Sequence, residues 1–372
     1  MTDREAYVAL NRIPGIGSIT AGRLLEVFGN FDAVFKAGPR ELSQVPGIGT
    51  FRAKLVDEGL QGTSFADELQ AAAKYGIKVI TLADPEYPDQ LRAIPDPPMV
   101  LYVAGNPDVL GRPGVAIVGT RRPSIYGRDT TEKFAFGLAS AGQVVFSGLA
   151  EGIDTKAHEG ALKATEGKTV AVIGAALDKL YPASNKELAR EIAVKGGAVV
   201  SEYPFGRSAD RQTFPMRNRI VSGLSKGVLV IEAPFGSGTL ITVDHALAQG
   251  RPVMAVPGRI DTPQSSGSNQ ILRGGAVLVT SVDEVLQELG GAGIRQGFLF
   301  EESKKICAPK PLQTPLSAEE TRIVACLAPE GVHIDAIIQQ TGLNAGDVNS
   351  LLVGLQLRRQ IKLLPGGMIY PS

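Results

Sequence analysis

The stretch VAIVGTRRPSIYG, residues Val115–Gly127, decides how the rest of the chain is interpreted. Four apolar residues, Val115–Val118, end abruptly at Gly119 and Thr120, and two arginines, a proline and a serine lead to the expected start of a helix at Tyr126. A short apolar run that is closed by turn residues is typical of a buried parallel strand. The carboxyl end of such a strand, beside a helix N-terminus, is where α/β proteins bind anions. The stretch therefore predicts a strand, a turn and a helix around a phosphate-binding site.

The residue types in this turn favour a polyanion. Backbone N–H groups and the positive end of the helix dipole would meet there, and Arg121 and Arg122 add formal charge. The dinucleotide fingerprint GxGxxG is absent, because Arg121 and Ser124 stand where its second and third glycines would be. A guanidinium group favours a polyanion over a cofactor pyrophosphate packed on bare backbone. The alternative is a tight strand-to-helix corner whose arginines only face solvent.

Length and composition indicate an ordinary globular chain. With 372 residues, 44% of them hydrophobic and 20% charged, we expect about two or three domains. The two cysteines, Cys307 and Cys326, cannot form a disulfide framework and lack metal-site spacing, which favours a reducing cytoplasm. No stretch approaches the ~20 apolar residues of a membrane span, and Met1–Glu5 is no signal peptide, so no membrane partner is expected.

The formal net charge is zero, which excludes a uniformly basic nucleic-acid-binding chain. Charge can nevertheless be segregated, and a local basic patch is what a polyanion requires. Residues Gly119–Arg128 contain three arginines and no acid. Residues Tyr203–Lys226 contain five basic residues, with Asp210 as their only acidic residue. Both basic segments fall in predicted connections and helix starts of one domain.

The first part of the chain, residues 1–62, contains a degenerate repeat. The sequence Ile13-Pro-Gly-Ile-Gly returns as Val45-Pro-Gly-Ile-Gly, 32 residues later, which marks two copies of one helical unit. The unit resembles the helix-hairpin-helix of SAM-like modules, in which the glycines let the turn approach a nucleic-acid backbone. Such hairpins also serve as plain packing modules, and the sequence leaves both roles open.

The middle of the chain predicts a Rossmann-like, doubly wound parallel sheet. Residues 63–111 are a connecting segment that leads into the core, with a strand at Ile77–Leu82 and a proline-dense run. Residues 112–289 alternate between apolar runs and helical segments, as parallel α/β domains do. The predicted strands are Val115–Val118, Val144–Phe146, Thr169–Ile173, Ala198–Val200, Val228–Ile231, Val253–Val256 and Val277–Val279. The polar loops that follow them would line one crevice at the carboxyl edge of the sheet.

Several motifs in this region occur in one order: GTRRPS, SGLAEGID, LDKLYP, SEYP, FPMRNRIVSGLS, SGTLIT with a following HALAQGRPVMAVPG, and NQILRGGA. Together they resemble the DNA-processing protein A family, also called DprA or Smf, over residues 112–289. The resemblance implies sequence-independent binding of single-stranded DNA and homodimerisation through the Rossmann-like core. It also implies protection of incoming DNA and loading of the recombinase RecA in natural transformation. Neither a cofactor nor a metal is expected.

The resemblance also supplies candidate nucleic-acid-binding residues. The ring of Phe214 would stack on a base beside cations, a combination that binds strands without reading sequence; the alternative is an ordinary core residue before a helix. The candidates are Gly119, Thr120, Arg121, Arg122, Ser124, Ser147, Gly148, Lys186, Phe214, Arg217, Asn218, Arg219, Ser237 and Gly238.

An enzyme is the strongest alternative. The stretch Pro234-Phe-Gly-Ser-Gly-Thr239 resembles a turn of Rossmann-like nucleotide phosphoribohydrolases. Those enzymes carry glutamates where this chain has Ile241 and Thr242, and without the carboxylates the groups that assist glycosidic bond cleavage are missing. The three histidines form no metal or triad pattern by spacing. We therefore predict no catalytic residues and no enzymatic activity.

The end of the chain predicts a linker and a winged helix. Residues 290–315 lose periodicity and end in prolines, as linkers do. Residues 316–372 predict helices at Ser317–Leu327, His333–Thr341 and Ala345–Arg358, then a strand-turn-strand at Gln360–Tyr370. The third helix would read the DNA groove in a repressor, but it has no basic residue before Arg358 and Arg359. A protein contact, weak duplex binding, and a transcriptional regulator with a nucleotide-sensing core all stay open.

Overall fold

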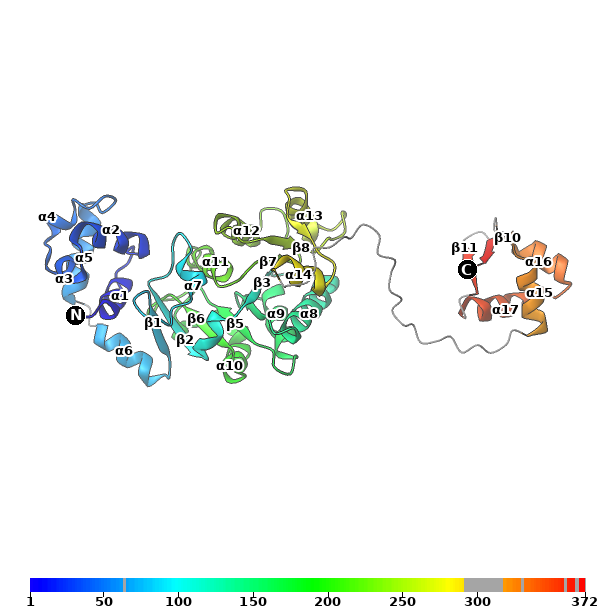
Figure 1. The fold of residues 1–372 in the computed structure, drawn as a ribbon, viewed down its shortest axis with the longest axis horizontal. Helices are drawn as coiled ribbons and strands as arrows, with labels where there is room; N and C mark the ends of the chain where they lie inside the picture. Colours follow the sequence, from blue (N-terminus) through cyan, green and yellow to red (C-terminus); the bar gives the residue numbers. More distant parts are fainter. Residues whose placement is uncertain (63–64, 291–316, 329–330, 358–359, 365–367, 372) are drawn as a thin grey trace. The chain divides into compact units, whose positions relative to one another are not determined.

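The computed structural model describes residues 1–62, 65–290, 317–328, 331–357, 360–364 and 368–371. It divides into two compact units, Met1–Ile294 and Arg295–Ser372, which we describe separately (Figure 1). The predicted linker, beyond Gly290, lies outside the described residues, as do Cys307, Arg358 and Arg359. The boundaries of the predicted domains stay predictions.

The N-terminal module is helical, and its tandem helix-hairpin-helix fold is confirmed. The two repeated Pro-Gly-Ile-Gly stretches form the turns between α1 and α2 and between α4 and α5. Gly15 and Gly47 have φ values of +80° and +81°, a conformation that favours glycine over every residue with a side chain. The helices are α1 (Asp3–Asn11), α2 (Ser18–Phe28), α3 (Phe31–Lys36), α4 (Pro39–Leu42), α5 (Thr50–Gly62) and α6 (Phe65–Lys74).

The first hairpin packs against the core. The Asn11 side-chain amide donates to the Glu202 carbonyl at 2.9 Å, and the Ser18 hydroxyl donates to the Asp96 carboxylate at 2.6 Å. Both bonds join residues that flank the first glycine turn to residues far along the chain. The first hairpin therefore acts as a packing module in this structure.

The core is one nine-stranded sheet of order β1-β2-β6-β5-β4-β3-β7-β8-β9. Strands β3 to β9 are all parallel, and each of the seven predicted apolar runs forms one of them. Apolar runs closed by turn residues are thus sufficient to find these strands. Their bounds are β3 (Gly114–Val118), β4 (Val144–Ser147), β5 (Thr169–Val172), β6 (Ala198–Ser201), β7 (Val228–Val230), β8 (Val253–Ala255) and β9 (Val277–Leu278).

The segment predicted to be only a connection, residues 63–111, adds two strands to this sheet. The expected strand is β1 (Lys78–Thr81), and an unexpected one is β2 (Val100–Gly105), which is antiparallel to both β1 and β6. Strand β2 was not predicted, because it directly follows the proline-dense run that ends at Pro98. The prolines flank the strand at Pro98 and Pro107, so they remove no hydrogen bond from its interior.

Helices cover both faces of the sheet (Figure 1). In β3, Ala116 and Val118 face one apolar layer, and Val115 and Ile117 face the other, as the alternation of a strand requires. One layer contains α7 (Asp89–Arg92), α11 (Thr213–Gly223), α12 (Gly238–Ala248) and α13 (Ser266–Arg273). The other contains α8 (Ile125–Ser140), α9 (Ile153–Leu162), α10 (Lys186–Val194) and α14 (Val282–Glu288).

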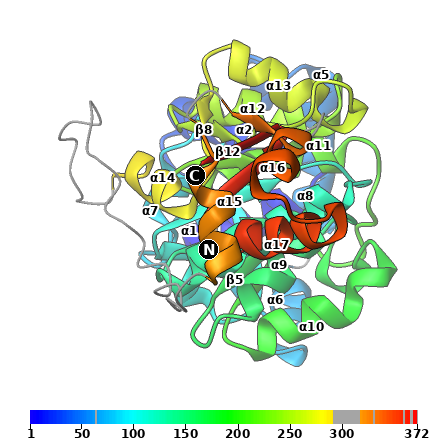
Figure 2. The same ribbon diagram turned by 90° about the vertical axis from the view of Figure 1, so that its right-hand side faces the viewer.

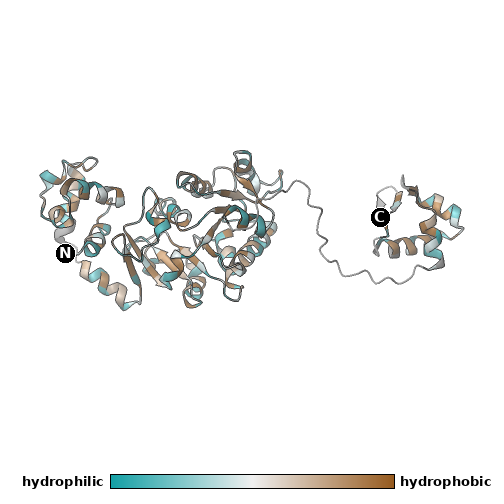
Figure 3. Cartoon of the chain, in the orientation of Figure 1, coloured by the Kyte–Doolittle hydropathy of each residue, from teal (hydrophilic) through white to brown (hydrophobic). Residues whose placement is uncertain are grey.

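The strands between these layers are predominantly apolar (Figure 3). The N-terminal module covers β1 and β2 from one side through α1 and α6. Four 3₁₀ turns complete the core, at Pro107–Gly111, Leu177–Lys179, Ala183–Asn185 and Pro263–Ser265.

The second unit is a winged helix, as predicted (Figure 2). Its core contains Ile323, Ile337, Leu352 and Ile369. One short strand, β10, was not predicted, because two residues carry no periodicity. The elements are α15 (Ala318–Ala325), β10 (Val332–His333), α16 (Ile334–Thr341), α17 (Ala345–Leu357), β11 (Ile361–Leu364) and β12 (Met368–Pro371), with strand order β10-β12-β11.

In the described part of the chain, no helix has the length and apolar character that a membrane span requires.

A neutral histidine is buried beneath the core sheet. The Thr169 hydroxyl donates to the Val145 carbonyl at 2.6 Å, so it must accept from His158 Nδ1, which lies 2.7 Å away. His158 Nε2 is buried and has no hydrogen-bond partner among the described residues. Burial, with a smaller effect of the Arg217 charge, lowers the pKa of His158 to about 3.

We expect His158→Asn to flatten the acid dependence of stability. Between about pH 6.5 and pH 3 the unfolded chain binds a proton at His158 and the folded chain does not. The histidine therefore costs up to about 1.4 kcal/mol of stability for each pH unit of acidification in this range. Asparagine can still donate to Thr169 and does not titrate. Urea unfolding at pH 7, 5.5 and 4 measures the two slopes, and parallel slopes would contradict a neutral buried imidazole.

Candidate nucleic-acid interface

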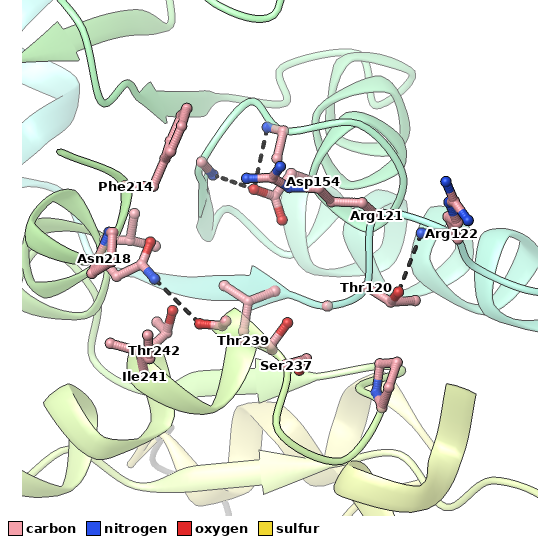
Figure 4. Close-up of a pocket in the computed structure, with 18 of the residues that line it drawn as sticks. Thr120, Arg121, Arg122, Asp154, Phe214, Asn218, Ser237, Thr239, Ile241 and Thr242 are labelled. Atoms are coloured by element: carbon pink, nitrogen blue, oxygen red, sulfur yellow. Dashed lines mark hydrogen bonds between the residues drawn. The ribbon is translucent and has the colours of Figure 1, made fainter. Parts of the chain in front are cut away.

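The candidate site lies where the strand order of the sheet reverses. Strand β3 has β4 on one side and β7 on the other, and the chain leaves β3 and β7 toward helices on opposite faces. A crevice forms at such a switch point, outside the carboxyl ends of the strands. Here it is a cavity of about 510 Å³, lined by the turns after β3, β4 and β7 and by α11 and α12 (Figure 4).

The backbone of the arginine turn after β3 is fixed by hydrogen bonds. The Thr120 N–H donates to the Glu232 carbonyl at 2.7 Å, and the Thr120 hydroxyl accepts from the Arg122 N–H at 3.2 Å. A Cβ at Gly119 would lie 2.5 Å from Ile153 and 2.8 Å from the Glu232 carbonyl, so no larger residue fits. Arg121 and Arg122 are exposed and line the cavity.

Ser124 holds this turn from its far end. Its hydroxyl accepts from the Gly127 N–H at 3.0 Å, as an N-cap of α8 does, and donates to the Glu232 carboxylate at 2.5 Å. The Ser124 N–H donates to the other Glu232 oxygen at 2.9 Å. Ser124 therefore lies outside the cavity lining, and its polar groups are used within the protein.

Ser147 and Gly148, the two site residues predicted at the end of β4, lie in different surroundings. Ser147 is fully buried, and its hydroxyl donates to the Ile117 carbonyl at 2.7 Å. Gly148 lines the cavity, and a Cβ on it would lie 1.5 Å from a guanidinium nitrogen of Arg217. Glycine is required here because the arginine packs directly on its backbone.

Arg217 lines the cavity but is 5% exposed. Its guanidinium donates to the Val172 carbonyl, at the end of β5, at 2.9 Å, and its Nε has no partner among the described residues. Burial lowers the pKa of Arg217 and raises the pKa of Asp154, and the charge of each group opposes the shift of the other. The sequence predicted a cation that contacts nucleic acid here, whereas the structure has a buried guanidinium in the cavity wall.

Phe214 lies beside exposed charge, as the stacking hypothesis expects. Its ring is half-buried, and the Arg121 guanidinium carbon lies 5.3 Å from the ring centroid. The ring of Tyr181 lies 5.7 Å away at an interplanar angle of 52°. Tyr181 was not among the predicted residues, although its position in a loop after β5 was a usable signal.

Arg219 belongs to a different part of the molecule. It is buried and pairs with Asp96 at 3.2 Å and with Glu202 at 2.7 Å, outside the lining of this cavity. Residues two apart on a helix point in different directions, so Arg217 and Arg219 cannot serve one site. Lys186 is exposed at the start of α10 and is not part of the lining either.

The N-terminus of α12 forms the wall opposite the arginine turn. Ser237 occupies the N-cap position, but its side chain makes no capping hydrogen bond. Ser237 and Gly238 line the cavity, where the first N–H groups of the helix favour anions. Asn218 also lines the cavity and donates to the Gly238 carbonyl at 3.4 Å, which joins α11 to α12 (Figure 4). Lining residues that the prediction missed include Thr239, Pro263 and Gln264. In the described residues no group of three or more His, Cys, Asp or Glu side chains could hold a metal ion.

The fold and the cavity define a class: a Rossmann-like core, with a cavity at its switch point, in one chain with a helix-hairpin-helix tandem and a winged helix. Comparison with family models agrees. Residues 78–290 match the DNA recombination-mediator protein A, residues 308–367 match the DprA winged helix domain, and residues 7–61 match the SAM-like helix-hairpin-helix tandem. The chain belongs to the family of the DNA recombination-mediator protein A, or DprA/Smf.

Similar proteins cover most of the chain. Protein Smf of Synechocystis is 34% identical over an alignment of 394 positions, which covers 98% of this chain and 98% of that one. The X-ray structure of DprA from Streptococcus pneumoniae superposes with a TM-score of 0.67 at 36% identity, covering 77% of this chain and 98% of that one. DprA from Helicobacter pylori, whose structure describes a single-stranded DNA binding mode, has a TM-score of 0.52 at 33% identity, covering 57% and 95%.

We expect Glu232→Ala to lower the free energy of unfolding by about 1–3 kcal/mol, because it leaves the Ser124 N–H and hydroxyl without an acceptor. Glu232→Gln should retain most of the stability, since its amide can accept from the N–H and donate to the hydroxyl. The exposed Glu166→Ala serves as a control. Urea unfolding compares the three, and an equal loss in the glutamine variant would show that the negative charge itself is required.

Proposed function

We propose that the protein binds single-stranded DNA, without sequence preference, in the cavity at the switch point. The observation that carries the proposal is the Arg121 guanidinium 5.3 Å from the half-buried Phe214 ring, at a cavity whose opposite wall is a helix N-terminus. The guanidinium and the free N–H groups of the helix N-terminus can bind phosphates, and the aromatic face can stack on any base. The single-stranded DNA binding mode described for the Helicobacter pylori relative supports the same assignment.

The candidate residues divide into two groups in this proposal. Arg121, Arg122 and the backbone of Gly119 contact phosphate from one side, and Ser237 and Gly238 contact it from the other. Phe214 stacks on a base. Thr120 is a positioning residue, because its N–H donates to the Glu232 carbonyl. The remaining candidates are positioning residues, which act through the contacts given above: Ser124, Ser147, Gly148, Arg217, Asn218 and Arg219. Lys186 would meet a strand only outside the cavity.

The decisive experiment measures binding of wild type, Arg121→Ala, Phe214→Ala and Arg190→Ala to labelled oligonucleotides at several salt concentrations. We expect Arg121→Ala to weaken binding to all single strands and to reduce the salt slope by about 0.7, the value of one phosphate contact. Phe214→Ala should cost about 1–3 kcal/mol of affinity and leave the slope unchanged. Arg190, an exposed arginine on α10, is the matched control and should bind as wild type does.

Single strands should bind more tightly than duplexes, because the cavity offers phosphate donors and a stacking ring but no reader for a groove. Tighter binding to one duplex sequence would favour the winged-helix regulator instead. Arg217→Ala is a poor test of whether Arg217 contacts DNA. It would leave the Asp154 carboxylate buried without the nearby positive charge, so it would also change the stability of the site. Normal binding by both Arg121→Ala and Phe214→Ala would exclude the cavity.

We also propose the finer role that the family resemblance implies: a cytoplasmic homodimer, joined through the core, that protects incoming DNA and loads RecA in natural transformation. We expect the protein to shorten the lag before RecA filaments form on a single strand already covered by a single-strand-binding protein. Measuring RecA-dependent ATP hydrolysis tests this, with Arg121→Ala as the variant that should not shorten the lag. An equal lag with and without wild-type protein would contradict the loading role.

The proposal includes no catalytic step and no cofactor. Ile241 and Thr242 line the cavity where a phosphoribohydrolase would carry glutamates. Among the described lining residues the one carboxylate is Asp154, and it accepts from the N–H groups of Gly148 and Ala150 at 3.1 and 3.3 Å. Glycosidic bond cleavage ordinarily uses a pair of carboxyl groups, and no second one lies among these lining residues.

A further inference from the structure

Large apolar side chains are exposed on segments that also contribute residues to the cavity lining. Phe235 is 74% exposed and Tyr126 is 51% exposed, and Ile125 and Ile260 are exposed as well. Phe235 and Ile260 come from the connections that follow β7 and β8, and Ile125 and Tyr126 begin α8, which follows β3. All four therefore lie at the carboxyl edge of the sheet. An aromatic ring at the tip of a loop contributes little to folding, so its presence needs another explanation.

One segment, residues 257–266, holds both aromatic residues close to the cavity. The Tyr126 hydroxyl donates to the Pro257 carbonyl at 3.2 Å, and the Phe235 N–H donates to the Ser266 hydroxyl at 2.9 Å. Within the same segment, Pro263 and Gln264 line the cavity. The neighbour of Phe235 in sequence, Pro234, lines it too. Tyr126 and Phe235 are therefore both bonded to a segment that also lines the cavity.

The surroundings of these rings are basic. Arg122 lies in the turn that leads to Tyr126, and Arg128 follows two residues after it, and both are exposed. Arg259, next to Ile260, is paired with Asp261 at 2.7 Å, so Arg122 and Arg128 supply the available charge. Aromatic faces that alternate with cations are the surface on which single strands stack.

We propose that Tyr126 and Phe235 form a second stacking platform, which binds nucleotides of the same strand where it leaves the cavity. The inference rests on the proposed function and extends it: the cavity holds one part of the strand, and the platform holds the part next to it. Arg122 lies between the two and would contact the phosphate that links them. The occupant is a single-stranded nucleic acid, and a protein partner is the alternative that the experiment must separate.

The chain contains no tryptophan, which allows a direct test. We place a single tryptophan at Phe235→Trp or at Tyr126→Trp, and as a control at Phe136→Trp, an exposed position on α8 ten residues beyond Tyr126. Each variant is titrated with oligothymidylates while indole emission is recorded, and binding is followed separately by anisotropy of a labelled strand. Stacking on thymine should quench the emission at 235 and 126 and leave it unchanged at 136.

Strand length gives a second readout. Phe235→Ala should lose about 5- to 150-fold in affinity for a strand of about 20 nucleotides, and should match wild type on a strand of about four, which only fills the cavity.

If the long strand binds but neither reporter is quenched, and Phe235→Ala binds it normally, the platform is refuted while the proposed function stands. If wild type binds no single strand, the proposed function itself fails. A changed oligomeric state of Phe235→Ala in sedimentation, with normal strand affinity, would assign the surface to a protein contact and also refute the platform.

Discussion

The site depends on the contacts that Glu232 makes at the end of β7. Its backbone carbonyl accepts from Thr120 and its buried carboxylate accepts from Ser124, so one residue holds both ends of the arginine turn that follows the neighbouring strand. A buried carboxylate requires such donors. The glycines around it follow from the same contacts, since a Cβ at Gly127 would lie 2.2 Å from the carboxylate. The exposed arginines are therefore presented by a backbone that has little freedom.

Much of the fold could be predicted from the sequence, because its signals are local. Each strand of the parallel core is a short apolar run that ends in turn residues, and the two Pro-Gly-Ile-Gly repeats mark the hairpins by themselves. The prediction failed at β2 and β10. Flanking prolines obscured the first, and the second is two residues long and exists only through its pairing with β12. In both cases the deciding contact comes from a partner far away in sequence.

The candidate site could be predicted less completely, for the same physical reason. The segment Tyr203–Lys226 has a large excess of basic residues, but the excess overstates the charge that a ligand meets. Arg207 pairs with Asp210, Arg217 is buried beside Asp154, and Arg219 is buried between Asp96 and Glu202. Neither Asp96 nor Asp154 lies near these arginines in sequence. Which arginines stay exposed is decided by the packing of α11, and no local count of charges contains that information.

Some arginines are buried beside carboxylates and others stay exposed, which explains how a chain of zero net charge can bind a polyanion. The buried arginines stabilise the carboxyl edge of the sheet, and Arg121 and Arg122 are the exposed arginines that line the cavity. Two cations and a helix N-terminus neutralise few phosphates, so the electrostatic part of the affinity is small and the salt dependence shallow. Stacking must then supply much of the binding free energy, and it is the part that tolerates any base. A modest site of this kind gains most from being duplicated, because two linked sites on one strand bind it far more tightly than either does alone.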